Sequence, residues 1–82
     1  MKLFAIRDTK GQFYGNPWTK RTPGEAERDF TQLAQDPQST IHKFPQDYDL
    51  YELGDFDENT GKITPLDTPH HIAKAVDCSA KH

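Results

Sequence analysis

The stretch from Asp47 to Asp57 constrains the fold of this 82-residue chain most, because it holds the densest run of apolar and aromatic residues between turn formers. Its apolar side chains alternate with acidic ones, which is typical of a β-strand with one packed face and one solvated face. The alternation slips between Leu50 and Tyr51, so we expect either partial cover on both faces or a β-bulge at that point. We interpret the stretch as the central strand of a sheet.

A helix is predicted over residues 22–36. Thr22 suits the N-cap, Pro23 suits the first helical position, and Glu25 completes a capping box three residues after the cap. Pro37 ends the pattern, because the residue before a proline avoids helical geometry. The apolar face of this helix recurs at helical spacing and consists of Ala26, Phe30, Leu33 and Ala34.

Turn signals divide the rest of the chain into two hairpins and a short helix. Asp8 and Gly11 mark a turn inside a basic hairpin over residues 1–21, and a second hairpin is predicted over residues 47–64. Residues 38–46 form a polar connector that Ile41 and Phe44 attach to the core. Thr68 before Pro69 again resembles a helix start, which predicts a short helix over 68–76 and a frayed tail over 77–82.

These elements predict one domain over residues 1–82 of the α+β class. We expect a small two-layer fold in which an antiparallel sheet of three to four strands carries the main helix on one face, with the short helix near the C-terminus. A chain of this length buries only ~60–65 % of its unfolded surface, so the core must be small. An exposed sheet face or edge would then be the natural surface of a homo-oligomer, with a dimer as the first expectation. The predicted core residues are Phe4, Ile6, Phe30, Leu33, Leu50 and Leu53.

Charge is unevenly distributed along the chain. The net charge of −3 argues against bulk electrostatic binding of nucleic acid. Residues 1–21 nevertheless carry +4, whereas residues 22–60 carry −8. The basic hairpin could therefore bind a phosphate backbone locally or pair with the acidic part of a second copy. No apolar run approaches the ~20 residues of a membrane span, and the single Cys78 suits a reducing cytosol.

The basic hairpin interleaves positive charge with aromatic rings, a combination that single-stranded DNA binders use. The same aromatics could instead form the core, with the lysines keeping an edge strand in solution, and this explanation is favoured because few other residues could build a core. Trp18 is interpreted first as a lid on the core and second as a stacking or docking ring. The candidate nucleic-acid-binding residues are Lys2, Arg7, Lys10, Tyr14, Trp18, Lys20 and Arg21.

No pattern of metal ligands or catalytic groups emerges. Asp55, Asp57 and Asn59 resemble the start of a calcium loop, but an EF-hand has glycine at its sixth position and glutamate at its twelfth, and this sequence has neither there. Adjacent His70 and His71 are poorly placed to bind one tetrahedral zinc, and the chain has no second cysteine. The sequence also contains no phosphate loop or nucleophile elbow. We therefore expect no metal, no cofactor and no enzymatic activity.

Five segments of the chain match those of a known phage family. They are Phe4-Ala-Ile-Arg-Asp8, Asp36-Pro37, Phe44-Pro-Gln-Asp-Tyr48, Leu50-Tyr-Glu-Leu-Gly-Asp-Phe-Asp57 and Pro69-His-His-Ile-Ala-Lys-Ala75. Through these segments the chain resembles the small nonstructural protein of gokushoviruses, which are single-stranded DNA phages of the Microviridae. The resemblance covers nearly the full length and is strongest over residues 44–57. It implies a role in viral DNA replication or packaging in the host bacterial cytoplasm, and it supplies no catalytic residues.

Two functional hypotheses follow. The first is a non-enzymatic, homo-oligomeric phage protein that binds single-stranded DNA through the basic hairpin and assists viral DNA synthesis or packaging. The second is a protein adaptor that docks on the phage replication protein, the procapsid or a host factor without touching DNA. Salt dependence separates them, because phosphate contacts release counterions and DNA affinity then falls steeply as salt rises. A weaker third hypothesis, a metal-dependent nuclease at Asp55 and Asp57, requires cleavage that depends on a divalent cation.

Overall fold

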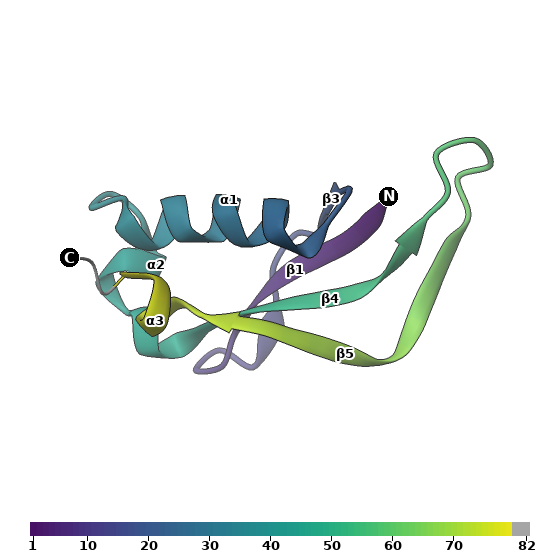
Figure 1. Ribbon diagram of the computed structural model, residues 1–82. Helices are drawn as coiled ribbons and strands as arrows, with labels where there is room; N and C mark the ends of the chain where they lie inside the picture. Colours follow the sequence, from purple (N-terminus) through teal and green to yellow (C-terminus); the bar gives the residue numbers. More distant parts are fainter. Residues whose placement is uncertain (80–82) are drawn as a thin grey trace.

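In the computed structural model, which describes residues 1–79, one long helix lies across an antiparallel sheet (Figure 1). This is the α+β architecture expected from the sequence, with a short C-terminal helix, but the sheet has four to five strands where three to four were predicted. The strand order is β2-β1-β4-β5, and β3 also pairs with β1. The strands are β1 (Lys2–Asp8), β2 (Phe13–Tyr14), β3 (Trp18–Lys20), β4 (Tyr48–Phe56) and β5 (Ile63–Lys74).

The main helix, α1 (Pro23–Gln35), begins and ends where the sequence predicts. The Thr22 hydroxyl accepts a hydrogen bond from the Glu25 amide at 3.2 Å, and the Glu25 carboxylate accepts one from the Arg21 amide at 3.0 Å. These two bonds close the N-terminus of the helix. The polar connector contains two short helices that the sequence analysis missed, α2 (Thr40–Lys43) and the 3₁₀-helix η1 (Pro45–Asp47).

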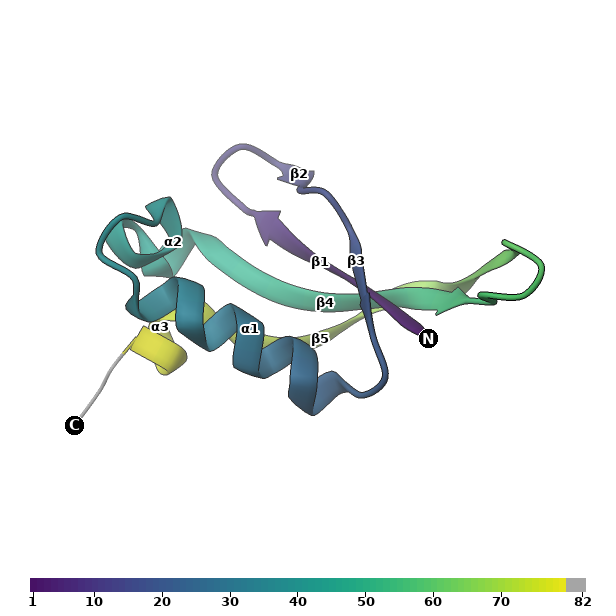
Figure 2. The same ribbon diagram turned by 90° about the horizontal axis from the view of Figure 1, so that it is seen from above.

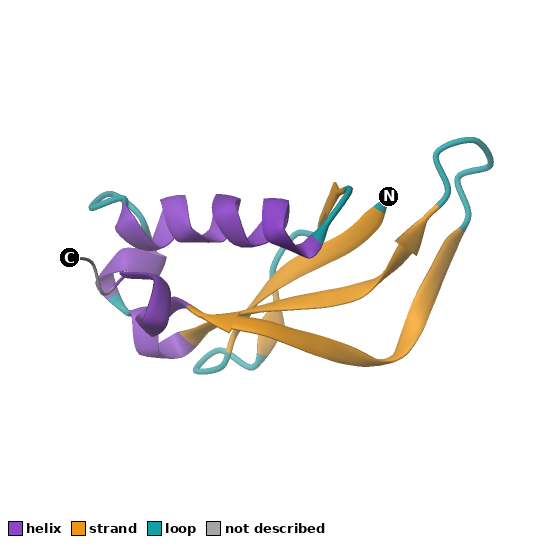
Figure 3. Cartoon of the chain, in the orientation of Figure 1, coloured by secondary structure: helices purple, strands orange, loops and turns teal. Residues whose placement is uncertain are grey.

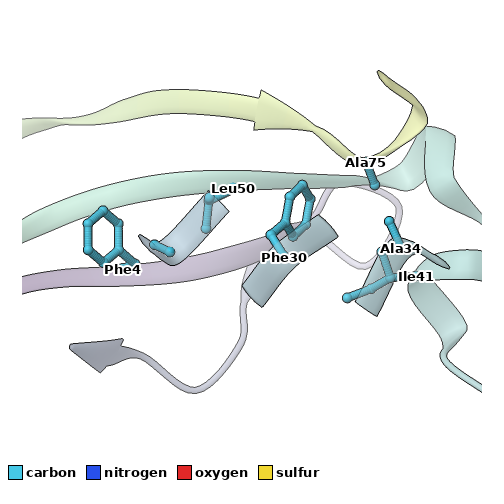
Figure 4. Packing of buried hydrophobic residues seen from close by; sticks show 7 residues of the cluster. Phe4, Phe30, Ala34, Ile41, Leu50 and Ala75 are labelled. Carbon is cyan, nitrogen blue, oxygen red and sulfur yellow. The ribbon is translucent and has the colours of Figure 1, made fainter. Parts of the chain in front are cut away.

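The core lies between α1 and the sheet (Figure 4). Phe4, Phe30 and Leu50 are fully buried there, as predicted, and Ile6 packs against them. The prediction was wrong for two core residues: Leu33 is 38 % exposed, and Leu53 lies outside the core cluster. The buried face of α1 is formed by Ala26, Phe30 and Ala34, which are four residues apart, and Leu33 falls at the margin of this narrow face. The completed core cluster consists of Phe4, Ala26, Phe30, Ala34, Ile41, Leu50 and Ala75.

The segment after the second turn corrects the prediction of a helix over 68–76. Residues up to Lys74 continue β5, and the C-terminal helix α3 (Ala75–Ser79) begins only then. Pairing with β4 is interrupted between the Gly54–Pro65 pair and the Glu52–His70 pair. Pro69 sits in this wide bulge, where no ladder hydrogen bond is required of it. Of the tail predicted to fray, Asp77–Ser79 belong to α3, and residues 80–82 lie outside the described part of the chain.

The N-terminal hairpin is also rearranged relative to the prediction. β2 pairs with the end of β1, the chain then leaves the sheet around Pro17, and β3 pairs with the beginning of β1. Trp18 is therefore the first residue of a strand, β3. Phe44, which we expected to attach the connector to the core, is 52 % exposed, whereas Ile41 is buried.

The ribbon views show two further features of the arrangement. Helices lie on one side and at one end of the sheet, which leaves the opposite face free of helices (Figure 3). The far end of the β4–β5 hairpin projects beyond α1 and β1 (Figures 1 and 2). None of the helices in residues 1–79 has the length and hydropathy needed to cross a membrane.

Candidate nucleic-acid interface

A row of three rings crosses the sheet on the face that no helix covers, which we call the open face. The Tyr14 and Tyr51 rings meet edge to face with centroids 5.6 Å apart, and the Tyr51 and His71 rings do so at 5.2 Å. The Arg7 guanidinium carbon lies 5.0 Å from the centre of the Tyr14 ring, within cation–π range. These side chains come from β1, β2, β4 and β5, so the row spans most of the width of the sheet.

Strand register explains why these residues meet. Phe4 and Ile6 face α1, so the alternation of β1 directs Ala5 and Arg7 to the other face. Cross-strand partners share a face: Ala5 pairs with Tyr51, and Arg7 pairs with both Tyr14 and Asp49. The bulge at Leu50/Tyr51 then brings His71 opposite Tyr51. The extra residue of this bulge is Ile72 of β5, whereas β4 pairs regularly with β1 through Leu50 and Tyr51. The slip in alternation seen in the sequence therefore reflects two successive residues on opposite faces, Leu50 in the core and Tyr51 in the ring row.

The open face combines these rings with a small positive charge. Arg7 and, by its pairing with Asp49, Lys74 are the permanent cations there. Asp49, an acid that shares this face with Arg7, has its Oδ1 3.6 Å from His71 Nε2. The two side chains form an ion pair only when the imidazole is protonated. The Asp49 side chain is only 14 % exposed, whereas that of His71 is 41 % exposed. The groups presented to solvent are therefore predominantly basic and aromatic.

Three of the seven predicted binding residues lie on the covered face instead. The Trp18 Nε1–H donates to Asp29 Oδ2 at 3.2 Å, and Lys20 Nζ lies 3.2 Å from the same oxygen. Lys2 Nζ lies 3.6 Å from Glu52 Oε2. The Trp18 ring packs on the core, 6.3 Å from Phe4 between centroids, which agrees with its interpretation as a lid. These side chains are occupied by internal contacts.

The other four predicted binding residues lie in three different places on the surface. Arg7 and Tyr14 belong to the open face, as described above. Lys10 lies in the exposed β1–β2 turn beside a shallow depression with Phe44 and Tyr48. Arg21 lines another depression, together with Asp55 and Glu58 at the opposite end of the sheet. The structure therefore does not bring the seven residues into one surface.

Sequence reasoning missed Tyr51 and His71, which complete the row. They lie far from the basic hairpin in the sequence and reach it only through strand pairing. The two successive large residues Leu50 and Tyr51 were the available signal, because neighbours in a regular strand point to opposite faces and one of them must lie on the face away from the core.

In the acidic turn after β4, an acidic side chain accepts hydrogen bonds from the backbone of the same turn. Hydrogen bonds from the backbone amides of Asn59 and Thr60 lower the pKa of the exposed Asp57, whose Oδ1 accepts the bond from Asn59 at 2.9 Å. The Asp57 side chain thus stabilises the tight turn between β4 and β5. Within residues 1–79, no three histidine, cysteine or acidic side chains are close enough to hold a metal ion.

Comparison with known proteins identifies the family. Searches of curated proteins and of solved structures gave no significant match. The family model described as "Phage ORF5 protein" matches residues 1–78, which is nearly the whole chain. The chain therefore belongs to the phage ORF5 protein family.

Proposed function

We propose that this phage ORF5 protein binds single-stranded DNA through its open face and assists synthesis or packaging of viral single-stranded DNA without catalysing a reaction. The observation that carries the proposal is the ring row Tyr14–Tyr51–His71 with Arg7 beside it. Membership of a phage family and the resemblance to gokushovirus nonstructural proteins favour a role in the viral DNA cycle in the host cytoplasm.

The chemistry of the open face suits an unpaired strand better than a duplex. Bases of a single strand can stack on aromatic side chains, and each such stack contributes about 1–3 kcal/mol with little dependence on sequence. The Arg7 guanidinium can contact a phosphate while it remains over Tyr14. Because the whole chain carries −3, attraction to DNA depends on this local surface rather than on the overall charge.

Fluorescence anisotropy of a labelled single-stranded oligonucleotide tests the proposal. Arg7→Ala and Tyr51→Ala should each weaken binding, Tyr51→Ala by about ten-fold to a hundred-fold if one base stacks there. Arg7→Ala should also reduce the slope of log affinity against log salt by about 0.7, the value for one phosphate contact on a single strand. Circular dichroism should show that both variants stay folded.

Two control variants match these substitutions in chemistry but not in position. Lys43→Ala removes an exposed cation from α2, and Phe44→Ala removes an exposed ring that follows it. Both should leave the affinity unchanged. Equal weakening by the controls would contradict a site on the open face, and absence of binding even at low salt would refute DNA binding and leave the protein adaptor.

A further inference from the structure

The two permanent cations of the open face lie in one row across the sheet, which we call the cation row. Arg7 of β1 pairs with Asp49 of β4, and Asp49 pairs in turn with Lys74 of β5. Neighbouring strands are about 4.8 Å apart, so the backbones at Arg7 and Lys74 are separated by about 10 Å. None of the ion pairs within residues 1–79 involves either cation. Both are therefore available to bind an anion.

The ring row runs beside the cation row. Tyr51 lies two residues along β4 from Asp49, on the same face, and its partner on β5 is His71. Two residues of a strand span about 6.7 Å, so the two rows are parallel neighbours that both run across the strands. A nucleotide that crosses the sheet therefore meets a cation with its phosphate and a ring with its base.

The charges at the ends of the strands oppose a path along them. The far end of the β4–β5 hairpin, residues 55–67, contains four acids and one lysine. At the other end, Asp47 directly precedes β4, and Asp8 is the last residue of β1. Residues 9–24, which include β2, contain no acid. A phosphate backbone thus meets less repulsion when it crosses from β2 to β5.

We propose that single-stranded DNA crosses the strands of the sheet, with its phosphates on Arg7 and Lys74 and its bases on the ring row. This inference rests on the proposed function, and it assigns Lys74 as the second phosphate-binding residue. Asp49 lies between the two cations, but its side chain is only 14 % exposed, so it presents little of its charge to the phosphates.

The direction of the path determines how many nucleotides the protein binds. From β2 to β5 the sheet has three gaps between strands, a width of about 14 Å. At about 3.4 Å per stacked nucleotide, and about twice that in an extended strand, this width fits about two to four nucleotides. A path along the nine residues of β4 would instead be about 30 Å long and fit about four to nine nucleotides.

Fluorescence anisotropy with labelled oligothymidylates of increasing length tests the direction. The affinity should rise steeply up to about four nucleotides and only slowly beyond, because longer strands then add alternative positions rather than new contacts. Lys74→Ala should lower the slope of log affinity against log salt by about 0.7, and Arg7→Ala/Lys74→Ala should lower it by about 1.4, the value for two phosphate contacts.

Lys62→Ala is the matched control. It removes an exposed lysine from the far end of the same hairpin and should leave both the affinity and the salt slope unchanged. Circular dichroism should show that all variants are folded.

The outcomes separate this inference from the proposed function. An affinity that keeps rising steeply towards nine nucleotides, or a salt slope that falls in Lys62→Ala but not in Lys74→Ala, overturns the crossing path. Binding to the open face would still stand in that case, provided that Tyr51→Ala weakens it. Absence of binding by the unmodified protein at every length, even at low salt, would refute the proposed function itself and the crossing path with it.

Discussion

The two faces of the sheet use the same kinds of side chain in opposite ways. On the covered face, cations and the Trp18 indole are held by acids of α1 and β4, and the apolar residues meet Phe30. On the open face, Arg7 and three rings contact one another across strands with no element above them. The difference shows that the aromatic and basic composition of a hairpin does not define a binding surface. Strand register decides which of its residues remain available.

The largest effect should come from the covered face. Phe30→Ala removes a fully buried ring from the centre of the core and should lower the free energy of unfolding by about 3–5 kcal/mol. Leu33→Ala, on the same helix but 38 % exposed, should cost far less. Urea denaturation of both variants measures the contrast. Equal losses would show that the margin of α1 is as important to the core as its centre.

A smaller effect is expected from the open face. Tyr51→Ala removes two edge-to-face contacts, each of which contributes about 0.5–1.5 kcal/mol beyond buried area. Tyr51→Phe keeps both ring contacts and should leave stability nearly unchanged. A loss for Tyr51→Ala as large as that for Phe30→Ala would mean that the open face is a second core, and the comparison between the faces would then fail.

The smallest effect concerns the hydrogen bond that holds Trp18. Trp18→Phe keeps a ring on Phe4 but removes the indole donor to Asp29, which should cost about 0.5–1.5 kcal/mol. In a double-mutant cycle with Asp29→Ala, the two losses should be less than additive, because both substitutions delete the same bond. If the two losses of stability were strictly additive, the hydrogen bond between Trp18 and Asp29 would not contribute to stability.

Local signals in the sequence predicted the elements that depend on local chemistry. The capping box placed α1, and the alternation around Leu50 placed the central strand. The helix predicted over 68–76 was wrong because Thr68 and Pro69 resemble a helix start, whereas strand pairing with β4 fixes β5 and its bulge accommodates the proline. Pairing between distant segments leaves no local mark, and this is also why His71 was not assigned to the site.

The burial of individual residues was predictable only where one face was unambiguous. Phe4, Phe30 and Leu50 were correct because each occupies the middle of an apolar face. Alternation along β1 puts Lys2 and Arg7 on opposite faces. The interruption at Pro17 then shifts the register so that Trp18 and Lys20 join the covered face, which no spacing rule for a simple hairpin anticipates.

An NMR titration of labelled protein with a single-stranded oligonucleotide tests the central claim most directly, because it reports each backbone amide separately. We predict that the largest chemical-shift changes fall on Arg7, Tyr14, Tyr51 and His71, with little change along α1. Changes centred on Trp18, Lys20 and the start of α1, or on the far end of the β4–β5 hairpin, residues 55–67, would contradict the assignment of the open face as the DNA-binding surface.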